Sequence, residues 1–443
     1  MQRRQMKCMN LQKRTDRNMS VDIYKNEIII KRADTAGGIY KSVEEIITQY
    51  DNHLPVNKDA AIVLKPNLNS NMNALTGNTT DLRIIVAVVK ILHSKGYKNI
   101  TIAEGTNSGF HRQGIDVIKR LKVDVLSDKL GIKYLDTNSV DARDVVFEDG
   151  VVAMAAKIFF EADYFINLPK LKMHYETEMS ACLKSLIGCL AGMKNKQKTH
   201  YSLIKNICNL NDQIKPNLHI LDAVIAMEGT GPTTGTPIKG GLIVAGSNPY
   251  LIDAAAAIIA HVPINDVPVL KEAKERGKLN GKDLEYLETL GLGSFSTAFK
   301  RPQISWLTAL VTHKKLQKYF QKIRHAPGIG SLFDKGLGNK LLFRLGVTQE
   351  VMINNEMGSV LLNHNHSRCI KCGYCKEYCP MGKPEPDKFS ENCIGCLYCF
   401  SCCPQRAISV NGELGFFEEQ IKQYDDIIRV VVQKKIIQVN DIL

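Results

Sequence analysis

Short apolar runs alternate with longer amphipathic stretches between about residues 21 and 292. The apolar runs are rich in Ile and Val and are typical of buried strands; they cover 27–32, 60–65, 99–104, 164–169, 218–224 and 241–246. The amphipathic stretches predict helices over Ser42–Tyr50, Asp81–Ser94, Glu178–Leu190, Ser202–Ile214 and Pro249–Ala260. Strands that alternate with helices predict an α/β fold with a mainly parallel sheet, whose function lies at the carboxyl ends of the strands.

The C-terminal part has a different pattern, in which cysteines recur at fixed spacing. Two runs each read Cys-x2-Cys-x2-Cys-x3-Cys-Pro. Three closely spaced thiolates can occupy three corners of one iron–sulfur cube, while the cysteine before proline ligates the other cube. We therefore expect two [4Fe–4S] clusters, one held by Cys369, Cys372, Cys375 and Cys403, and the other by Cys393, Cys396, Cys399 and Cys379.

Structural zinc is the alternative interpretation of paired cysteines. Zinc gains nothing from a third cysteine in each run or from the Cys-Pro ending, so the pattern favours iron–sulfur clusters. Cys402 is an additional thiol beside Cys403, and the spacing favours Cys403 as the ligand. This region is expected to fold as an α+β ferredoxin-like module.

The chain length of 443 residues indicates several units. We expect a basic disordered tail at 1–20, the α/β domain at 21–295, a basic amphipathic segment at 296–356, the ferredoxin-like module at 357–412 and an extension at 413–443. The sequence contains no apolar run long enough to cross a membrane and no secretory signal, so a cytoplasmic protein is expected.

The net charge of +13 is concentrated in one region. Residues 300–344 contain ten Lys or Arg and one acidic residue, Asp334. Three interpretations remain open: a solvated linker, a helix packed on a neighbouring domain, or peripheral contact with an anionic membrane through 300–346. Nucleic acid is not expected as a partner; a redox partner protein or a small-molecule electron donor is.

Three motifs carry a resemblance to a known family. They are VLKPNLN (63–69), INLPKLKMHYETEMSACLKSLIGCLAG (166–192) and DAVIAMEGTGPTTGTPIKGGLIVAGSNPYLIDAAAAII (222–259). Over roughly 24–290 the chain resembles the domain of unknown function 362 family, whose members often carry a ferredoxin module. The family usually has Asp before the proline of the third motif, where this chain has Asn248. The resemblance implies no particular reaction.

Several polar residues follow predicted strands and are candidates for substrate binding. Lys65 and Asn67 follow one strand, and Glu104 ends the next, although a tight turn with a solvated lysine is an equal alternative. A glycine-rich loop after a later strand could contact substrate or phosphate through Glu228, Gly229 and Gly231. This loop lacks the spacing of a nucleotide-binding fingerprint.

Three further residues are the candidate catalytic group. His174 is expected in a loop just past a strand, Lys184 in an apolar helix or turn, and His200 in a basic stretch. A buried lysine has a lowered pKa and can act as nucleophile or base. The spacing is faintly similar to that of nickel-pincer lactate racemases, which implies acid–base histidines and a cofactor-anchoring lysine, but the glycine pattern around Lys184 departs from that family.

These residues leave three functions open. The first is a redox enzyme whose clusters pass electrons to a substrate or cofactor in the α/β domain. The second is a non-enzymatic electron carrier or an assembly or docking protein. The third is a racemase-like enzyme with structural clusters. The first requires His174, Lys184 and His200 to share one site near Lys65 and Glu104, with the cysteine module packed beside it.

Overall fold

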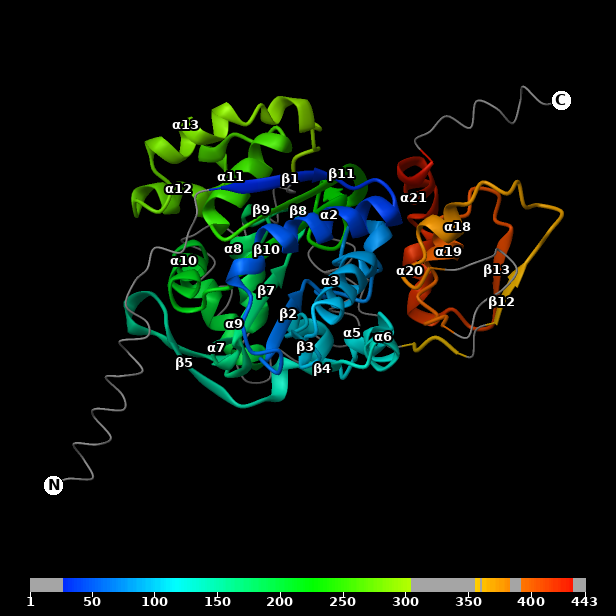
Figure 1. The fold of residues 1–443 in the computed structure, drawn as a ribbon, viewed down its shortest axis with the longest axis horizontal. Helices are drawn as coiled ribbons and strands as arrows, with labels where there is room; N and C mark the ends of the chain where they lie inside the picture. The colour runs from blue at the N-terminus through cyan, green and yellow to red at the C-terminus, as the bar shows by residue number, and fades with distance from the viewer. Residues whose placement is uncertain (1–26, 304–354, 359–360, 383–391, 433–443) are drawn as a thin grey trace, which may run out of the picture.

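The computed structural model describes residues 27–303, 355–358, 361–382 and 392–432. Its central sheet has the order β1-β11-β10-β7-β2-β3-β4 (Figure 1). These strands are β1 (Ile28–Arg32), β2 (Ile62–Pro66), β3 (Ile100–Glu104), β4 (Lys133–Asp136), β7 (Tyr164–Leu168), β10 (Leu218–Glu228) and β11 (Thr236–Gly246). The strands from β10 to β4 are parallel, whereas β11 pairs antiparallel with both of its neighbours, β10 and β1. The predicted α/β fold with a mainly parallel sheet is confirmed.

Helices and a separate hairpin surround this sheet (Figure 1). The hairpin pairs β5 (Ala142–Val146) with β6 (Val152–Ala156). The helices of this domain are α2 (Ala36–Gln49), α3 (Leu82–Ser94), α4 (Ser108–Arg112), α5 (Val117–Arg120), α6 (Val123–Leu130), α7 (Ile158–Glu161), α8 (Cys182–Ser185), α9 (Gly192–Thr199), α10 (Leu203–Gln213), α11 (Pro249–Ile259), α12 (Pro268–Glu275) and α13 (Gly281–Thr289).

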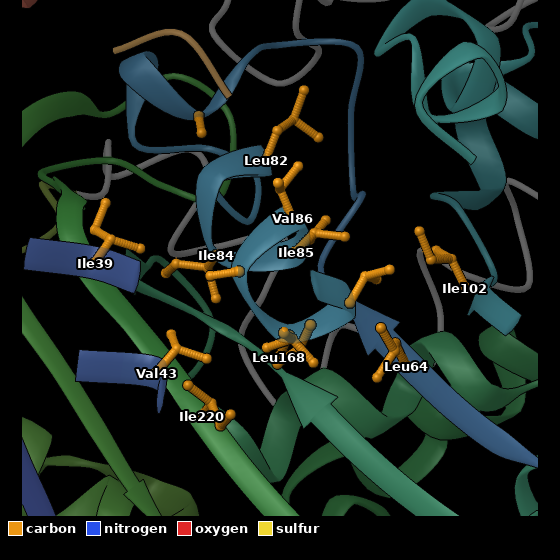
Figure 2. Close-up of a cluster of buried hydrophobic side chains, with 14 of the residues drawn as sticks. Ile39, Val43, Leu64, Leu82, Ile84, Ile85, Val86, Ile102, Leu168 and Ile220 are labelled. Carbon is orange, nitrogen blue, oxygen red and sulfur yellow. The ribbon is translucent and has the colours of Figure 1, made fainter. Parts of the chain in front are cut away.

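Helix α3 forms much of the core beside the sheet. Asp81 is its N-cap, and the Asp81 side chain accepts a hydrogen bond from the Arg83 backbone N–H. The apolar residues of α3 pack with side chains of β2, β3, β7 and β10 (Figure 2). Burial of these aliphatic side chains fixes α3 against the carboxyl half of the sheet.

The predicted helix over Glu178–Leu190 is wrong. The chain there forms the short strand β9 (Glu178–Ser180), then α8, then a 3-10 turn over Leu186–Cys189. A strand that the sequence analysis missed, β8 (Lys170–His174), pairs with β9 and with β10. His174 therefore ends a strand rather than lying in a loop. The chain reverses direction after His174, and Glu178–Ser180 then pair antiparallel with β8. This pairing replaces the first turn of the predicted helix.

The C-terminal module has the small mixed fold expected of a ferredoxin-like unit. Its strands β12 (Leu361–His364) and β13 (Ile408–Asn411) pair antiparallel, and α18 (Tyr374–Glu377) and α19 (Tyr398–Ser401) follow the cysteine loops. Two further helices, α20 (Glu418–Ile421) and α21 (Tyr424–Val431), lie in the segment predicted as an extension. Tyr378, Ile394 and Tyr398 are buried in the same apolar cluster as α3, so the module packs on the α/β domain.

Among the described residues, none of the helices has both the length and the apolar character that crossing a membrane requires. The predicted tail at 1–20 and nearly all of the basic segment at 300–346 lie outside the described residues.

Candidate functional site

Strand β8 presents a row of buried cationic and basic side chains. Lys170, Lys172 and His174 alternate along it, so that all three side chains share one face, and each is at most 3% exposed. Leu171 and Met173 face the opposite side and belong to a second apolar cluster. The alternating Lys-Leu-Lys-Met-His sequence is the signal that could have predicted this strand and its polar face.

His174 and Lys184 meet directly. The Lys184 Nζ lies 2.7 Å from His174 Nε2. Burial lowers the pKa of Lys184 to about 8, and nearby Glu176 partly opposes this effect. Burial, followed by the charge of Lys184, lowers the pKa of His174 well below its usual value, so His174 is neutral.

Lys184 is placed by a carboxylate from a distant helix. Asp253 lies in α11 and accepts hydrogen bonds from the backbone N–H groups of Cys182 (2.7 Å) and Leu183 (3.0 Å). These donors are the first residues of α8, so Asp253 fixes the short helix that carries Lys184. The sequence analysis assigned no such role to Asp253.

His200 joins this group through Glu176. His200 Nδ1 lies 3.7 Å from a Glu176 carboxylate oxygen, and the Glu176 backbone N–H donates to His174 Nδ1 (3.1 Å). The pKa of His200 is lowered mainly by burial. His174, Lys184 and His200 therefore lie in one group, which we call the His174–Lys184 group, with Glu176 as a fourth member that sequence reasoning missed.

Lys65 and Glu104 form a buried ion pair at the same edge of the sheet. Their Nζ and Oε2 atoms are 2.8 Å apart, and Lys65 also donates to Ser185 Oγ (3.1 Å), the residue after Lys184. Lys65 is 0% exposed, so the alternative of a solvated lysine is wrong. Burial raises the pKa of Glu104, against the lowering effect of Lys65. Asn67 accepts a hydrogen bond from Lys172 Nζ (3.0 Å).

The glycine-rich loop after β10 lies near the His174–Lys184 group but contributes backbone rather than side chains. Glu228 pairs with Lys300, whose Nζ is 3.3 Å away, and Gly229 donates its N–H to the Lys300 carbonyl. The Gly231 carbonyl accepts from the Tyr175 N–H (3.3 Å). A Cβ at Gly231 would lie 2.0 Å from the Met173 carbonyl oxygen, so close packing against β8 requires glycine there.

Lys196 is another residue that the sequence analysis missed. Its Nζ donates to the carbonyls of Gly105 (2.8 Å) and Thr106 (2.7 Å) and to Asn138 Oδ1 (2.6 Å). Burial lowers its pKa to about 8. Gly105 and Thr106 belong to the loop after Glu104, so their hydrogen bonds to Lys196 fix the conformation of that loop.

The two cysteine runs have matching backbone conformations. Residues two and four positions after the first cysteine have positive φ in both runs: Lys371 and Gly373 in one, Gly395 and Leu397 in the other. The N–H of the second residue after Cys369, and likewise after Cys393, lies 3.4 Å from that cysteine's Sγ. Helices α18 and α19 also begin at the same offset. Backbone N–H groups directed at thiolate sulfurs are a feature of cluster-binding loops.

Several of the cysteines lie close to one another. The pKa of Cys396 is raised well above its usual value by burial and then by its neighbours Cys399, Cys379 and Cys393. These four residues line one cavity. The pKa of Cys372 is raised by burial and then, among charged neighbours, by Cys403 and Cys369.

We call Cys379, Cys393, Cys396 and Cys399 the inner set, and Cys369, Cys372, Cys375 and Cys403 the outer set. Within the described residues, no His, Cys, Asp and Glu side chains are grouped tightly enough for a single metal ion. A cubane cluster is larger than a single metal ion, and the four cysteines of the inner set line one cavity.

Residues 67–82, which we call the interdomain segment, contact both the His174–Lys184 side and the cysteine module. On one side Asn67 Oδ1 and the Asn78 carbonyl accept from Lys172 Nζ, at 3.0 and 2.7 Å. On the other side the Asn73 N–H donates to Gln420 (3.0 Å), and the Leu82 N–H donates to the Tyr398 hydroxyl (3.4 Å). A cavity at this interface is lined by the segment and by module residues that include Cys396.

Comparisons with known proteins agree with this architecture. Residues 62–258 match the family model "Domain of unknown function (DUF362)", and residues 362–382 match the "4Fe-4S binding domain" model. The chain is 28% identical over 237 residues to Thylakoid-associated protein sll1697 of Synechocystis sp., covering 49% of this chain and 68% of that protein.

A solved structure also matches in part. It is the lactate racemase apoprotein from Thermoanaerobacterium thermosaccharolyticum, with a TM-score of 0.38 and 10% sequence identity. The match covers 53% of this chain and 57% of that one, which is less than two thirds of its length.

Proposed function

We propose that this iron–sulfur protein, which matches the DUF362 model followed by the 4Fe-4S binding domain model, is a redox enzyme. In this proposal two [4Fe–4S] clusters pass electrons to a substrate or cofactor bound at the His174–Lys184 group. Lys65, Asn67 and Glu104 line the same edge of the sheet.

The interdomain segment is the observation that carries this proposal. The same sixteen or so residues bind Lys172, which precedes His174 on β8, and also bind Tyr398 and Gln420 of the cysteine module. A carrier that only docks partner proteins would not need a buried acid–base group behind the surface on which its own cluster module packs. This arrangement favours electron transfer within the chain.

The second cluster is supported by the repeated conformation of the cysteine loops. Only the first run lies within the matched 4Fe-4S segment. The second run has the same positions of positive φ, the same N–H to Sγ contact and a helix at the same offset. Each run supplies three thiolates to one set and its Cys-Pro cysteine to the other.

The protein residues would handle the protons that accompany electron transfer. The clusters, when bound, supply single electrons. Lys184, with a pKa of about 8, exchanges a proton near neutral pH. Glu176, whose charge acts on both Lys184 and His200, would relay it. The buried Lys65–Glu104 ion pair helps to position Lys184, because Lys65 donates a hydrogen bond to the adjacent residue, Ser185.

The proposal is tested by reoxidation of the reduced protein. Anaerobically purified protein should contain about eight iron and eight sulfide per chain, from two complete cysteine runs. We would reduce it with dithionite, remove the reductant and add fractionated metabolites while following the charge-transfer absorbance. The active fraction should reoxidise the wild-type clusters at least tenfold faster than those of His174→Gln.

The matched control is His53→Gln, which changes an exposed histidine of the same domain. It should behave as wild type. Equal reoxidation of His174→Gln and wild type would favour the electron-carrier or docking alternative. Interconversion of an enantiomer by cluster-containing protein without any reoxidation would favour the racemase-like alternative.

We also propose where the protein acts and which partners it has. The Synechocystis relative is named as thylakoid-associated, and the ten basic residues at 300–344 favour peripheral contact with an anionic membrane from the cytoplasmic side. Salt-sensitive sedimentation with phosphatidylserine vesicles, absent with neutral vesicles, would test this contact. A redox partner protein or small-molecule donor would reduce the clusters.

A further inference from the structure

The hydrogen bonds of His174 determine which of its nitrogens carries the proton. The Glu176 backbone N–H donates to His174 Nδ1 (3.1 Å), so Nδ1 must present a lone pair. A neutral imidazole with an unprotonated Nδ1 carries its proton on Nε2. Because His174 is 3% exposed and surrounded by lysines, it has no stabilisation for a second proton.

The proton on His174 Nε2 also affects the protonation state of Lys184. The Nε2–H of His174 points at Lys184 Nζ, 2.7 Å away, and a hydrogen bond there requires a lone pair on that nitrogen. An ammonium group has three donors and no acceptor. This contact, whose donor is oriented by the Glu176 backbone N–H, therefore favours the free-amine form of Lys184 over the ammonium form.

The surroundings of Lys184 also favour the neutral amine. Burial lowers its pKa to about 8, while Glu176 acts in the opposite sense. Lys184 is only half-buried, and the His200 side chain beside it is 36% exposed. Lys184 and His200 therefore lie on a side of the group that is partly exposed to solvent.

We propose that Lys184 forms a Schiff base with a small aldehyde or ketone. The Nζ lone pair attacks the carbonyl carbon to form a C–N bond, and the carbonyl oxygen takes a proton to give a carbinolamine. The hydroxyl group then leaves as water and a C=N bond forms. Both hydrogens of that water come from the amine. Glu176 and His200 are placed to move these protons. The step needs no oxidant or reductant.

This inference deepens the proposed function because it names the substrate class of the same site. The basic surroundings of Lys184 favour a carbonyl compound that also carries a carboxylate, such as a 2-oxo acid. Schiff-base formation involves no electron transfer, so it can be tested with the clusters oxidised and independently of the proposed redox reaction.

The experiment is reductive trapping on the full-length, cluster-containing protein under anaerobic conditions. Glyoxylate, pyruvate and acetaldehyde would each be added with cyanoborohydride, which converts an imine into a stable secondary amine. Peptide mass spectrometry would then compare Lys184 with Lys194, an exposed lysine ten residues away. Lys184 should be labelled at least tenfold faster than Lys194, and faster by the two oxo acids than by acetaldehyde.

Labelling of Lys184 no faster than that of Lys194 would overturn the proposal. A His174→Phe variant, which has no Nε2–H to donate, should lose most of the rate advantage of Lys184 while its circular dichroism shows it folded. An undiminished advantage in that folded variant would overturn the role assigned to His174. Labelling at Lys184 without substrate-dependent cluster reoxidation would leave the Schiff base standing and remove the redox proposal.

Discussion

Cys402 and Cys403 are neighbouring thiols with different surroundings. Cys403 belongs to the outer set, and its Sγ accepts from the Ala407 N–H (3.2 Å). Cys402 is 0% exposed in the apolar cluster shared with the α/β domain, with its Sγ directed at the Cys399 carbonyl. The sequence spacing and the structure therefore favour Cys403 as the ligand.

We expect Cys403→Ala to lose or convert one cluster, which iron analysis and electron paramagnetic resonance would detect. Cys402→Ala should keep the full iron content but lower the free energy of unfolding by about 1 kcal/mol, since it removes a buried sulfur. Equal loss of iron in both variants would show that the ligand assignment is wrong.

Asp253 gives the stability of the protein a defined pH dependence. Burial raises the pKa of Asp253 to about 7, against the lowering effect of its bonds to Leu183 and Cys182. In the unfolded chain the pKa is about 3.9. The folded state therefore binds more protons than the unfolded state between about pH 4 and 7, and this contribution to stability falls as the pH rises through that range.

We expect the slope from Asp253 to be at most about 1.4 kcal/mol per pH unit, measured by chemical denaturation at several pH values. Asp253→Asn keeps an oxygen acceptor for α8 but cannot titrate, so its stability should decline less between pH 5 and 7 than that of the wild type. Parallel curves for the two proteins would contradict the raised pKa.

At the residue scale the two sets of cysteines can be proposed from the sequence because their spacing is local. The sequence also placed His174, Lys184, His200, Lys65 and Glu104 at one edge of the sheet. It missed Glu176, Lys172 and Lys196, because a polar residue that is buried by distant parts of the chain has the same letter as a solvated one. Their burial depends on β9, α9 and the interdomain segment.

Helix α3 directs its N-terminal end at the inner set of cysteines. The Leu82 N–H donates to Tyr398, the residue before Cys399. The Arg83 guanidinium lies 4.4 Å from the ring centroid of Tyr378, the residue before Cys379, while it pairs with Asp81 at 2.7 Å on its other side. Both the helix end and the guanidinium place positive charge toward the inner set.

A positive charge favours the reduced, more negative form of a cluster. We therefore expect Arg83→Gln to lower the midpoint potential of the inner cluster, by an amount on the order of 59 mV, which is a tenfold change in a one-electron ratio. Arg83→Lys should retain most of the wild-type value. Potentiometric titration followed by electron paramagnetic resonance would measure both clusters.

The matched control is Arg368→Gln, an exposed arginine beside the outer set. Solvent screens its charge, so its effect on either potential should be small. An inner-cluster potential that does not move in Arg83→Gln would show that the guanidinium serves only packing.

At the element scale the predictions succeeded where hydrophobic periodicity was unbroken. The strands β2, β3 and β7 and the helices α3, α10 and α11 follow the expected ranges closely, whereas β10 continues four residues beyond its expected end. Strand β8 was missed because two lysines and a histidine occupy its alternate positions, which reads as a polar loop. The residues from Glu178 on were taken for a helix because their apolar positions also fit helical spacing, and only pairing with β8 decides otherwise.

At the scale of the whole molecule, the sequence led us to expect that the two domains pack together. It did not indicate which residues form the contact. Electron transfer required the cysteine module to pack near the carboxyl ends of the strands. Which residues make that contact depends on complementary surfaces such as Asn73 with Gln420 and Arg120 with Glu356, whose ion pair measures 2.5 Å. No local pattern in the sequence links such distant positions.

The position of the interdomain segment also bears on how the protein would respond to air. Destruction of the inner cluster by oxygen would remove the support of the loops around Ile394 and Tyr398, and with it the partners of Leu82 and Asn73. The same segment holds Lys172, so loss of the inner cluster would also loosen the hydrogen bonds that position Lys172 on the same strand as His174. Faster amide exchange in residues 67–82 after aeration, with α13 unchanged, would reveal this coupling, and equal exchange before and after aeration would show that the two parts fail independently.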